Sequence, residues 1–223
     1  ELKKLIMYVD KIWQELAPES IVYMPDDDAV AELKMRARRA HLKLISYPTR
    51  HIGTDKTAQA LFRAKKMLEP YVEIKLKTEV KRILIEDSKV IGIELNDGEK
   101  IYGRYVVIAP GRSGAKWFVS EIRRLGIPLR INPVDIGVRV EVLSDVLAEL
   151  TDIQYEPKLI YYSKTFDDKV RTFCVNPYGF VVKERYEDIV TVNGHSYQNK
   201  KSDNTNFAIL VTSYFTWPFK DPI

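Results

Sequence analysis

The sequence of 223 residues contains one cysteine and three histidines, and this scarcity excludes two kinds of site. A single cysteine cannot form an internal disulfide, so a disulfide framework is excluded and a reducing compartment is favoured. The histidines, at positions 41, 51 and 195, do not have the spacing of metal ligands on a helix. We therefore predict a cytoplasmic protein without a metal site.

Long apolar runs are also absent, although 45% of the residues are hydrophobic. The longest runs, at residues 106–109 and 207–211, are far shorter than the roughly 20 residues that cross a bilayer. We therefore expect no membrane partner. Lys and Arg number 35 against 31 Asp and Glu, a surplus that neither demands nor excludes a polyanionic partner. The composition is that of a globular chain that can bury a core.

No glycine is followed by a second glycine two positions later, so the dinucleotide-binding fingerprint is missing. That pattern forms the tight turn on which a backbone approaches a pyrophosphate. If the chain handles a dinucleotide, the main phosphate-binding turn lies outside this sequence. Because the sequence also begins at Glu1 directly in a helical pattern, we expect a central fragment, with the N- and C-terminal parts of the same protein as its partners.

Apolar residues spaced three and four apart predict three helices in the first 70 residues. The first covers residues 2–16 and ends at Ala17-Pro18. The second follows Asp26, which is a helix-capping residue type, and the third follows Asp55. The inward positions that we expect are Val30, Leu33, Ala37 and Ala40 in the second helix and Leu61, Ala64 and Leu68 in the third.

From residue 71 the apolar period becomes extended, which predicts a three-stranded antiparallel meander at residues 80–85, 90–95 and 101–109. Residues 105–109 are continuously apolar, as in a strand that is covered on both faces. They stop at a Gly-bearing turn, residues 110–114, before a predicted helix. A buried strand, such a turn and a helix form the half-unit of doubly wound nucleotide-binding folds.

After residue 133, a period of two predicts a long strand at 134–142 with one core face and one wet face. Turn residues separate several further short apolar runs, which indicates a mainly antiparallel second part. We place the boundary between the two parts near residues 127–133. The further strands are predicted at 159–162, 170–175, 180–182, 189–192 and 207–212.

Two polar segments are candidate sites. Residues 50–55 bring Arg50 and His51 into a loop, where they could bind a ligand or exchange protons near neutral pH. Helix capping with solvated neighbours explains the same residues. The second segment, Gly194-His195-Ser196, is largely explained by Asx turns; His195 is the better ligand-facing candidate if the two segments share a cleft. The sequence leaves both interpretations open.

A run of cations without an acid among them supports a second functional hypothesis, a non-catalytic nucleic-acid-binding module. Cations in such a run can bind the phosphates of a nucleic acid. A solvated helix face explains the run better, because no aromatic residues are interleaved for base stacking. The cations are Lys34, Arg36, Arg38, Arg39 and Lys43.

Several motifs together resemble known flavoproteins. Residues 77–80, 89–93, 97–99 and 105–114 are similar to the middle section of FAD-dependent oxidoreductases of the glutathione-reductase-like superfamily, in which a meander leads back into the FAD-binding sheet. A second set is more particular and resembles the bacterial proteins called FAD-dependent dehydrogenases, with a likeness over nearly the whole chain. This second set comprises residues 48–55, 132–141, 192–196 and 204–208.

The resemblance implies an α+β or α/β fold in two parts. Residues 1–130 would be a partial FAD-binding domain with a helical N-terminal segment, the meander and one strand-turn-helix unit. Residues 131–223 would be a substrate domain of mainly antiparallel β-structure. The implied function is an oxidoreductase that transfers hydride between a small-molecule substrate and flavin.

The resemblance also implies roles for particular residues. Val80 would pair its main chain with the adenine of FAD, and residues 109–111 would pass close to the cofactor. His51 or His195 would move a proton, and Arg50 would hold an anionic substrate or flavin oxygen. Because the glycine fingerprint and the closing C-terminal Gly-Asp segment are missing, we expect this chain alone to bind FAD weakly or not at all and to be inactive. The predicted cofactor residues are Val80, Ala109, Gly111, Arg112 and Gly114.

Overall fold

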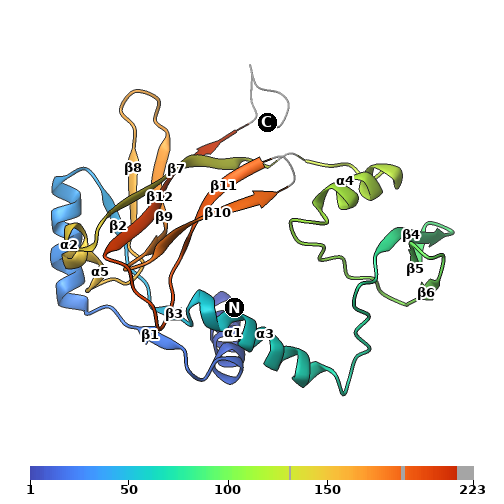
Figure 1. The fold of residues 1–223 in the computed structure, drawn as a ribbon. Helices are drawn as coiled ribbons and strands as arrows, with labels where there is room; N and C mark the ends of the chain where they lie inside the picture. Colours follow the sequence, from blue (N-terminus) through green and yellow to red (C-terminus); the bar gives the residue numbers. More distant parts are fainter. Residues whose placement is uncertain (131, 187–188, 215–223) are drawn as a thin grey trace. The chain divides into compact units, whose positions relative to one another are not determined.

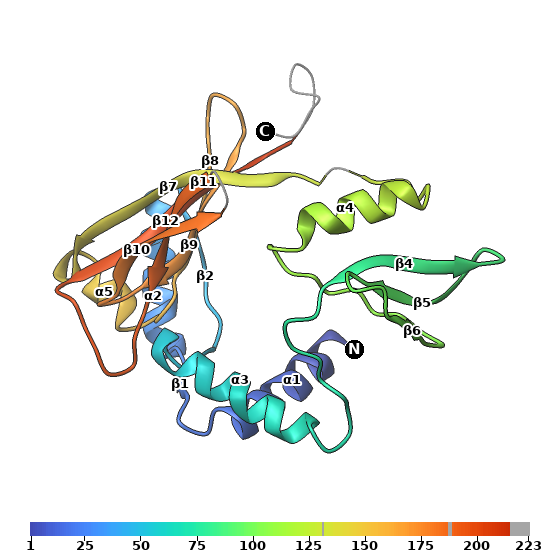
Figure 2. The same ribbon diagram turned by 45° about the vertical axis from the view of Figure 1, so that its right-hand side comes forward.

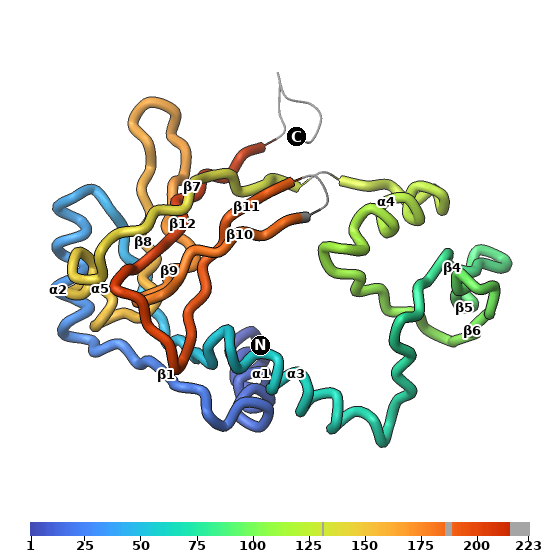
Figure 3. Tube along the Cα trace, in the orientation of Figure 1, coloured from blue at the N-terminus to red at the C-terminus, as the bar shows by residue number. Residues whose placement is uncertain are grey.

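The computed structural model describes residues 1–130, 132–186 and 189–214, which form a mixture of helices and antiparallel sheets (Figure 1). The chain divides into two compact units. The first combines Glu1–Leu68 with Asn132–Ile223, and the second is Glu69–Ile131. The chain leaves the first unit after the third helix and returns to it at residue 132, as the tube in Figure 3 shows.

This division differs from the single boundary at 130/131 that the sequence suggests. The structure has a second boundary at 68/69, because β2 (Lys43–Ile45) pairs with β8 (Lys158–Tyr162). The first 68 residues therefore belong with the C-terminal sheet. No helix in the described residues is long and apolar enough to cross a membrane.

The three predicted helices of the first unit are confirmed as α1 (Leu2–Leu16), α2 (Asp27–Arg39) and α3 (Thr54–Leu68). Asp26 caps α2 as predicted, since its carboxylate accepts a hydrogen bond from the amide of Ala29 at 2.9 Å. This cap fixes where α2 begins.

The predicted inward face of α3 is wrong at two positions. Leu61 and Leu68 are 57% and 51% exposed, whereas Ala60 is fully buried. The helices α1 and α3 lie side by side in Figures 1 and 2, and Ala60 packs against Leu16 and Ala17 at their contact. A small residue allows this close approach, so the contact follows the alanines rather than the leucines.

The main sheet of the first unit has five antiparallel strands in the order β2-β8-β9-β12-β7. Its core lies at the β2 end, where Leu33 and Ala37 of α2 pack on Leu44. The inward positions Val30, Leu33 and Ala37 are thus confirmed, and Ala40 is exposed beyond the helix end. The other elements of this sheet and its cover are β7 (Val134–Leu143), η1 (Ser144–Val146), α5 (Ala148–Thr151), β9 (Lys169–Asn176) and β12 (Asn204–Ser213).

The expected core face of β7 is wrong over its first half. Val134, Ile136 and Val138 are between 41% and 63% exposed. Helix α2 packs at the β2 edge of the sheet, whereas β7 forms the opposite edge. The alternation of β7 correctly predicts a strand, but it does not show how far the covering layer extends.

Two strand pairs complete the first unit. β10 (Phe180–Tyr186) and β11 (Ile189–His195) form an antiparallel hairpin, close to the prediction. β1 (Ile21–Tyr23) pairs with β3 (Thr49–His51), and neither three-residue strand has a pattern long enough to predict. Because side chains alternate along a strand, β3 places Arg50 on one face and His51 on the other.

The second unit contains the predicted meander, with α4 (Ala115–Arg124) tied to its first strand. The Glu121 carboxylate accepts a hydrogen bond from the amide of Ile83 at 2.9 Å, and Arg124 donates to the carbonyl of Ile83 at 2.8 Å. Figure 2 shows α4 beside this meander. The strands are β4 (Val80–Glu86), β5 (Lys89–Leu95) and β6 (Lys100–Tyr102).

The buried strand predicted at residues 105–109 is not present. β6 ends at Tyr102, and the segment that follows is irregular, with Tyr105 82% and Val107 92% exposed. A continuously apolar strand is typical of a parallel sheet whose two faces are both covered by helices. No parallel strand pair occurs in the described residues. The turn and helix of the expected half-unit are therefore present without its strand.

Candidate functional sites

The first candidate site lies around His51 in the first unit, where a half-buried aromatic cluster has formed. The imidazole of His51 is 4.9 Å from the ring of Tyr155, measured between centroids. Tyr155 stacks on Tyr23 of β1 at 4.0 Å, and its hydroxyl is 2.7 Å from the Oγ of Ser196. Three segments that are distant in the sequence therefore gather, through Tyr155, beside the predicted proton carrier.

The two predicted polar segments are in direct contact. The amide of Thr54 donates to the carbonyl of Ser196 at 2.8 Å, and the amide of Gln198 donates to the Asp55 carboxylate at 3.0 Å. Gly53 makes this approach possible: its φ is +86°, and a Cβ there would lie 2.7 Å from the amide nitrogen of Gln198. The two segments therefore meet through their backbones, and the shared cleft on which the preference for His195 depended is not among the hollows found in the described residues.

Two polar atoms in this cluster are buried without a hydrogen-bond partner among the described residues. They are the Nε2 of His51 and the Oγ1 of Thr49, both on the same face of β3. Buried polar atoms are nearly always paired in folded proteins. An imidazole nitrogen and a hydroxyl left unpaired on the same face of β3 are therefore two groups that a polar ligand could satisfy.

Burial controls the protonation of this cluster. It lowers the pKa of His51 below 6.5, with the nearby Asp55 carboxylate acting in the opposite direction. Burial also raises the pKa of Tyr155 to about 12, against the effect of its hydrogen bond with Ser196. At neutral pH the imidazole is therefore neutral and can accept a proton, while the phenol keeps its own.

The other two predicted catalytic residues are directed elsewhere. Arg50, on the opposite face of β3, donates two hydrogen bonds to Asp10 of α1, at 2.6 and 3.0 Å, and one to Ser20. Its guanidinium therefore already has a carboxylate partner. The Nδ1 of His195 lies 3.3 Å from the hydroxyl of Tyr197. The three side chains do not converge on one point.

The second candidate site is a hollow of about 710 Å³ in the second unit, between the meander and the segment before α4. It brings together three of the five predicted cofactor residues, Val80, Ala109 and Gly114. Gly111, with a φ of +63°, and Arg112 belong to the turn between them and are not among the lining residues. Gly114 keeps this turn tight, because a Cβ there would lie 2.5 Å from the Cβ of Pro110.

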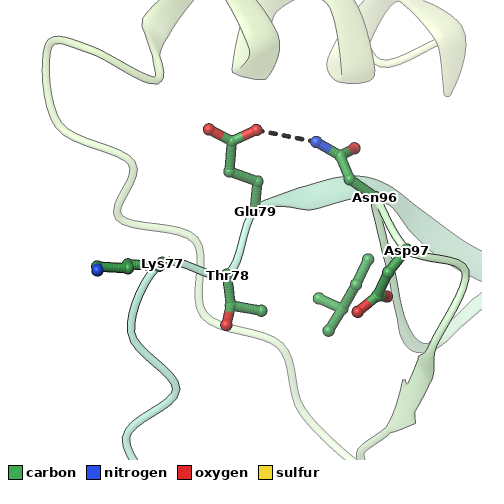
Figure 4. Close-up of a pocket in the computed structure, with 6 residues that line it drawn as sticks. Lys77, Thr78, Glu79, Asn96 and Asp97 are labelled. Carbon is green, nitrogen blue, oxygen red and sulfur yellow. Dashed lines mark hydrogen bonds between the residues drawn. The ribbon is translucent and has the colours of Figure 1, made fainter.

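The walls of this hollow combine apolar side chains with main-chain groups. Val106 and Ile108 line it. Within the described part of the chain, residues 105–109 make no hydrogen bond to another main-chain group. A neighbouring hollow of about 590 Å³ shares Thr78, Glu79 and Asn96 with the first. Figure 4 shows the amide of Asn96 donating to the Glu79 carboxylate, a 2.9 Å bond that ties the start of β4 to the turn after β5.

No protein-family model and no curated protein matches this sequence.

The run of cations does not form one surface. Arg36 forms an ion pair with Glu149, and the guanidinium of Arg39 contacts the sulfur of Met35. Lys34, Arg38 and Lys43 line a separate hollow. In the described residues, no three His, Cys, Asp or Glu side chains gather as a metal site.

Sequence reasoning identified His51 and the loop of His195 but missed Tyr155, Tyr23 and Thr49. Tyr155 lies 104 residues after His51, in a segment without apolar periodicity, and no local pattern links the two. The stacking partner Tyr23 depends on the short pair β1-β3. These contacts are tertiary, so only the fold could reveal them.

Proposed function

We propose that this chain is part of an FAD-dependent oxidoreductase that transfers hydride between a small-molecule substrate and flavin. The observation that carries the proposal is the hollow in the second unit. Three residues that the sequence resemblance assigns to FAD, Val80, Ala109 and Gly114, line it together although 34 positions separate the first from the last.

The lining of the hollow fits a part of FAD. An adenine ring has apolar faces and a polar edge that carries donors and acceptors. Apolar side chains of Val80, Val106 and Ile108 could cover the faces, while main-chain groups of residues 105–109 could meet the edge. Bound flavin would supply the redox chemistry, accepting or giving a hydride at N5.

In this proposed reaction, residues of the first unit hold and move a proton. His51 is neutral at neutral pH, and its Nε2 has no partner among the described residues, so this atom can accept a proton. Tyr155 retains its proton and orients the neighbouring Ser196 hydroxyl. Arg50 is held by Asp10 and would bind an anion only through its remaining donor capacity.

The test is FAD affinity in the protein expressed from its complete gene, measured by titrating FAD into cofactor-stripped protein. Ala109→Trp should weaken FAD binding at least about tenfold, because the indole would fill the hollow. Ala115→Trp is the matched control, since Ala115 is exposed on α4 and is not among the lining residues. Equal affinities for the two variants would reject the hollow as the FAD site.

A further inference from the structure

The C-terminal half of α2 and the strand that follows it bring three cations to one hollow. The hollow has a volume of about 540 Å³ and is lined by Lys34 and Arg38 of α2 and by residues 43–46. Lys34 and Arg38 are four residues apart and therefore lie above one another on the same helix face. Lys43 begins β2.

Core packing fixes the geometry of this hollow. Leu33 and Ala37 alternate with the cations along α2, and both pack against Leu44, which adjoins Lys43. All three apolar residues are at most 9% exposed. The backbone positions of the three cations are therefore set by a rigid contact between helix and strand, which reduces the cost of ordering them around a ligand.

No carboxylate neutralises these cations. In the described residues none of the three forms an ion pair, whereas the neighbouring Arg36 pairs with Glu149. The residues one turn from Lys34 on its own face carry no acid. These are Val30, Ala31, Ala37 and Arg38.

The strand offers hydrogen-bond donors in the same place. β2 is an edge strand of the five-stranded sheet, with β8 on one side only. Within the part of the chain that the structure describes, the main-chain amides on its other side have no strand partner, and residues 43–46 all line the hollow. Backbone amides beside concentrated positive charge form the usual environment for a phosphate group.

We propose that this hollow binds a soluble ligand through a phosphate or pyrophosphate group. Three like charges held close together repel one another, and an anion that enters the hollow would relieve this repulsion. None of the lining residues is aromatic, so the hollow lacks the stacking platform of a single-stranded nucleic-acid site. This site is independent of the hollow proposed for FAD.

The test is calorimetric titration of the protein with inorganic pyrophosphate at low ionic strength. We expect saturable binding that weakens as salt is added. The double variant Lys34→Gln/Arg38→Gln should bind at least about tenfold more weakly, because it loses two charged donors. The matched control Arg36→Gln/Arg39→Gln makes the same charge change on the same helix and should bind within about twofold of the unchanged protein.

Three results would overturn the proposal. The first is the absence of saturable binding by the unchanged protein. The second is an equal loss in the two double variants, which would show a general effect of net charge. The third is that a short DNA strand binds more tightly than pyrophosphate and that its binding is also weakened by the Lys34→Gln/Arg38→Gln substitutions. That result would favour a nucleic-acid site. If the double variant Lys34→Gln/Arg38→Gln fails to fold, the single variant Lys43→Gln takes its place and should also bind pyrophosphate more weakly than the unchanged protein.

Discussion

At the residue scale, burial makes His51 a pH-dependent element of stability. Its pKa in the folded chain is below the ordinary 6.5 that applies in the unfolded chain. As the pH falls below about 6.5, His51 becomes protonated in the unfolded chain but stays neutral in the folded chain. The folded state therefore loses stability until the pH falls below the pKa of His51 in the folded chain. Above this range the residue has no such effect.

We therefore expect the unchanged protein to lose more stability than His51→Gln between about pH 8 and pH 5.5. Gln does not titrate but can still donate and accept hydrogen bonds. Urea unfolding at the two pH values measures the difference, since the other titrating groups are common to both proteins. Equal losses would show that the imidazole is not desolvated.

The hydroxyl of Tyr155 offers a second residue-scale prediction. Tyr155→Phe removes the 2.7 Å hydrogen bond and leaves Ser196, which is 6% exposed, without that partner. We expect a loss of about 1 to 2 kcal/mol in the free energy of unfolding. Tyr162→Phe is the control, because Tyr162 is 54% exposed, and it should cost less than about 0.5 kcal/mol. Denaturant unfolding measures the loss in the free energy of unfolding for both variants. Equal losses would contradict a stabilising hydrogen bond between Tyr155 and Ser196.

At the scale of elements, Glu121 joins α4 to β4. Its carboxylate accepts hydrogen bonds from the amide of Ile83 and from Arg124, and Arg124 holds the pKa of Glu121 below its ordinary value of 4.5. The stabilisation is therefore present above about pH 4.5 and is lost as the pH falls through the lower pKa of the folded chain.

We expect Glu121→Ala to destabilise the second unit by about 2 kcal/mol near pH 7, because the buried amide of Ile83 loses its acceptor. Glu86→Ala removes an exposed carboxylate at the end of the same strand and should have an effect below about 0.5 kcal/mol. Hydrogen exchange of the β4–β6 amides measures both variants. Faster exchange in the Glu86 variant than in the Glu121 variant would contradict this assignment.

Helices and strands that are specified by residues close to them in the sequence were predictable. α2 has its own cap at Asp26, and β4-β5 and β10-β11 are hairpins between nearby residues. The burial of a face was less predictable, because it depends on what packs there. Leu61 on α3 and Val138 on β7 carry the right periodicity but are exposed, since the covering elements lie elsewhere.

The candidate sites were predictable to different degrees. His51 and His195 were singled out as unusual polar residues expected in loops; the structure places each at the end of a strand, β3 and β11, and the segments that follow the two strands meet. The stacking of Tyr155 on Tyr23 was not predictable, because the two rings are 132 positions apart and are brought together by tertiary packing. The hollow beside Val80 depended on a family resemblance rather than on spacing.

At the scale of the whole molecule, the first and last segments of the chain share one sheet. β2 pairs with β8, and Leu33, Ala37 and Leu44 form a core with side chains that include Leu150 and Leu159. A chain consisting of residues 132–223 alone would leave that core half empty and would turn β8 into an open edge.

We therefore expect residues 132–223 alone to give a poorly dispersed amide NMR spectrum. The same residues joined to residues 1–68 through a flexible linker should give a dispersed one, because the linker restores β2 and α2. A folded spectrum from residues 132–223 alone would contradict this assignment and would support the simple boundary at 130/131.

Our proposal that this chain is part of a flavoprotein is tested by the visible absorbance spectrum of the protein expressed from its complete gene, compared with the spectrum of this chain. We expect the bands of oxidised flavin in the first spectrum, with FAD released on denaturation. We expect none in the second, because the glycine fingerprint for the pyrophosphate is missing from this sequence. A colourless product of the complete gene that added FAD does not reconstitute would contradict the claim.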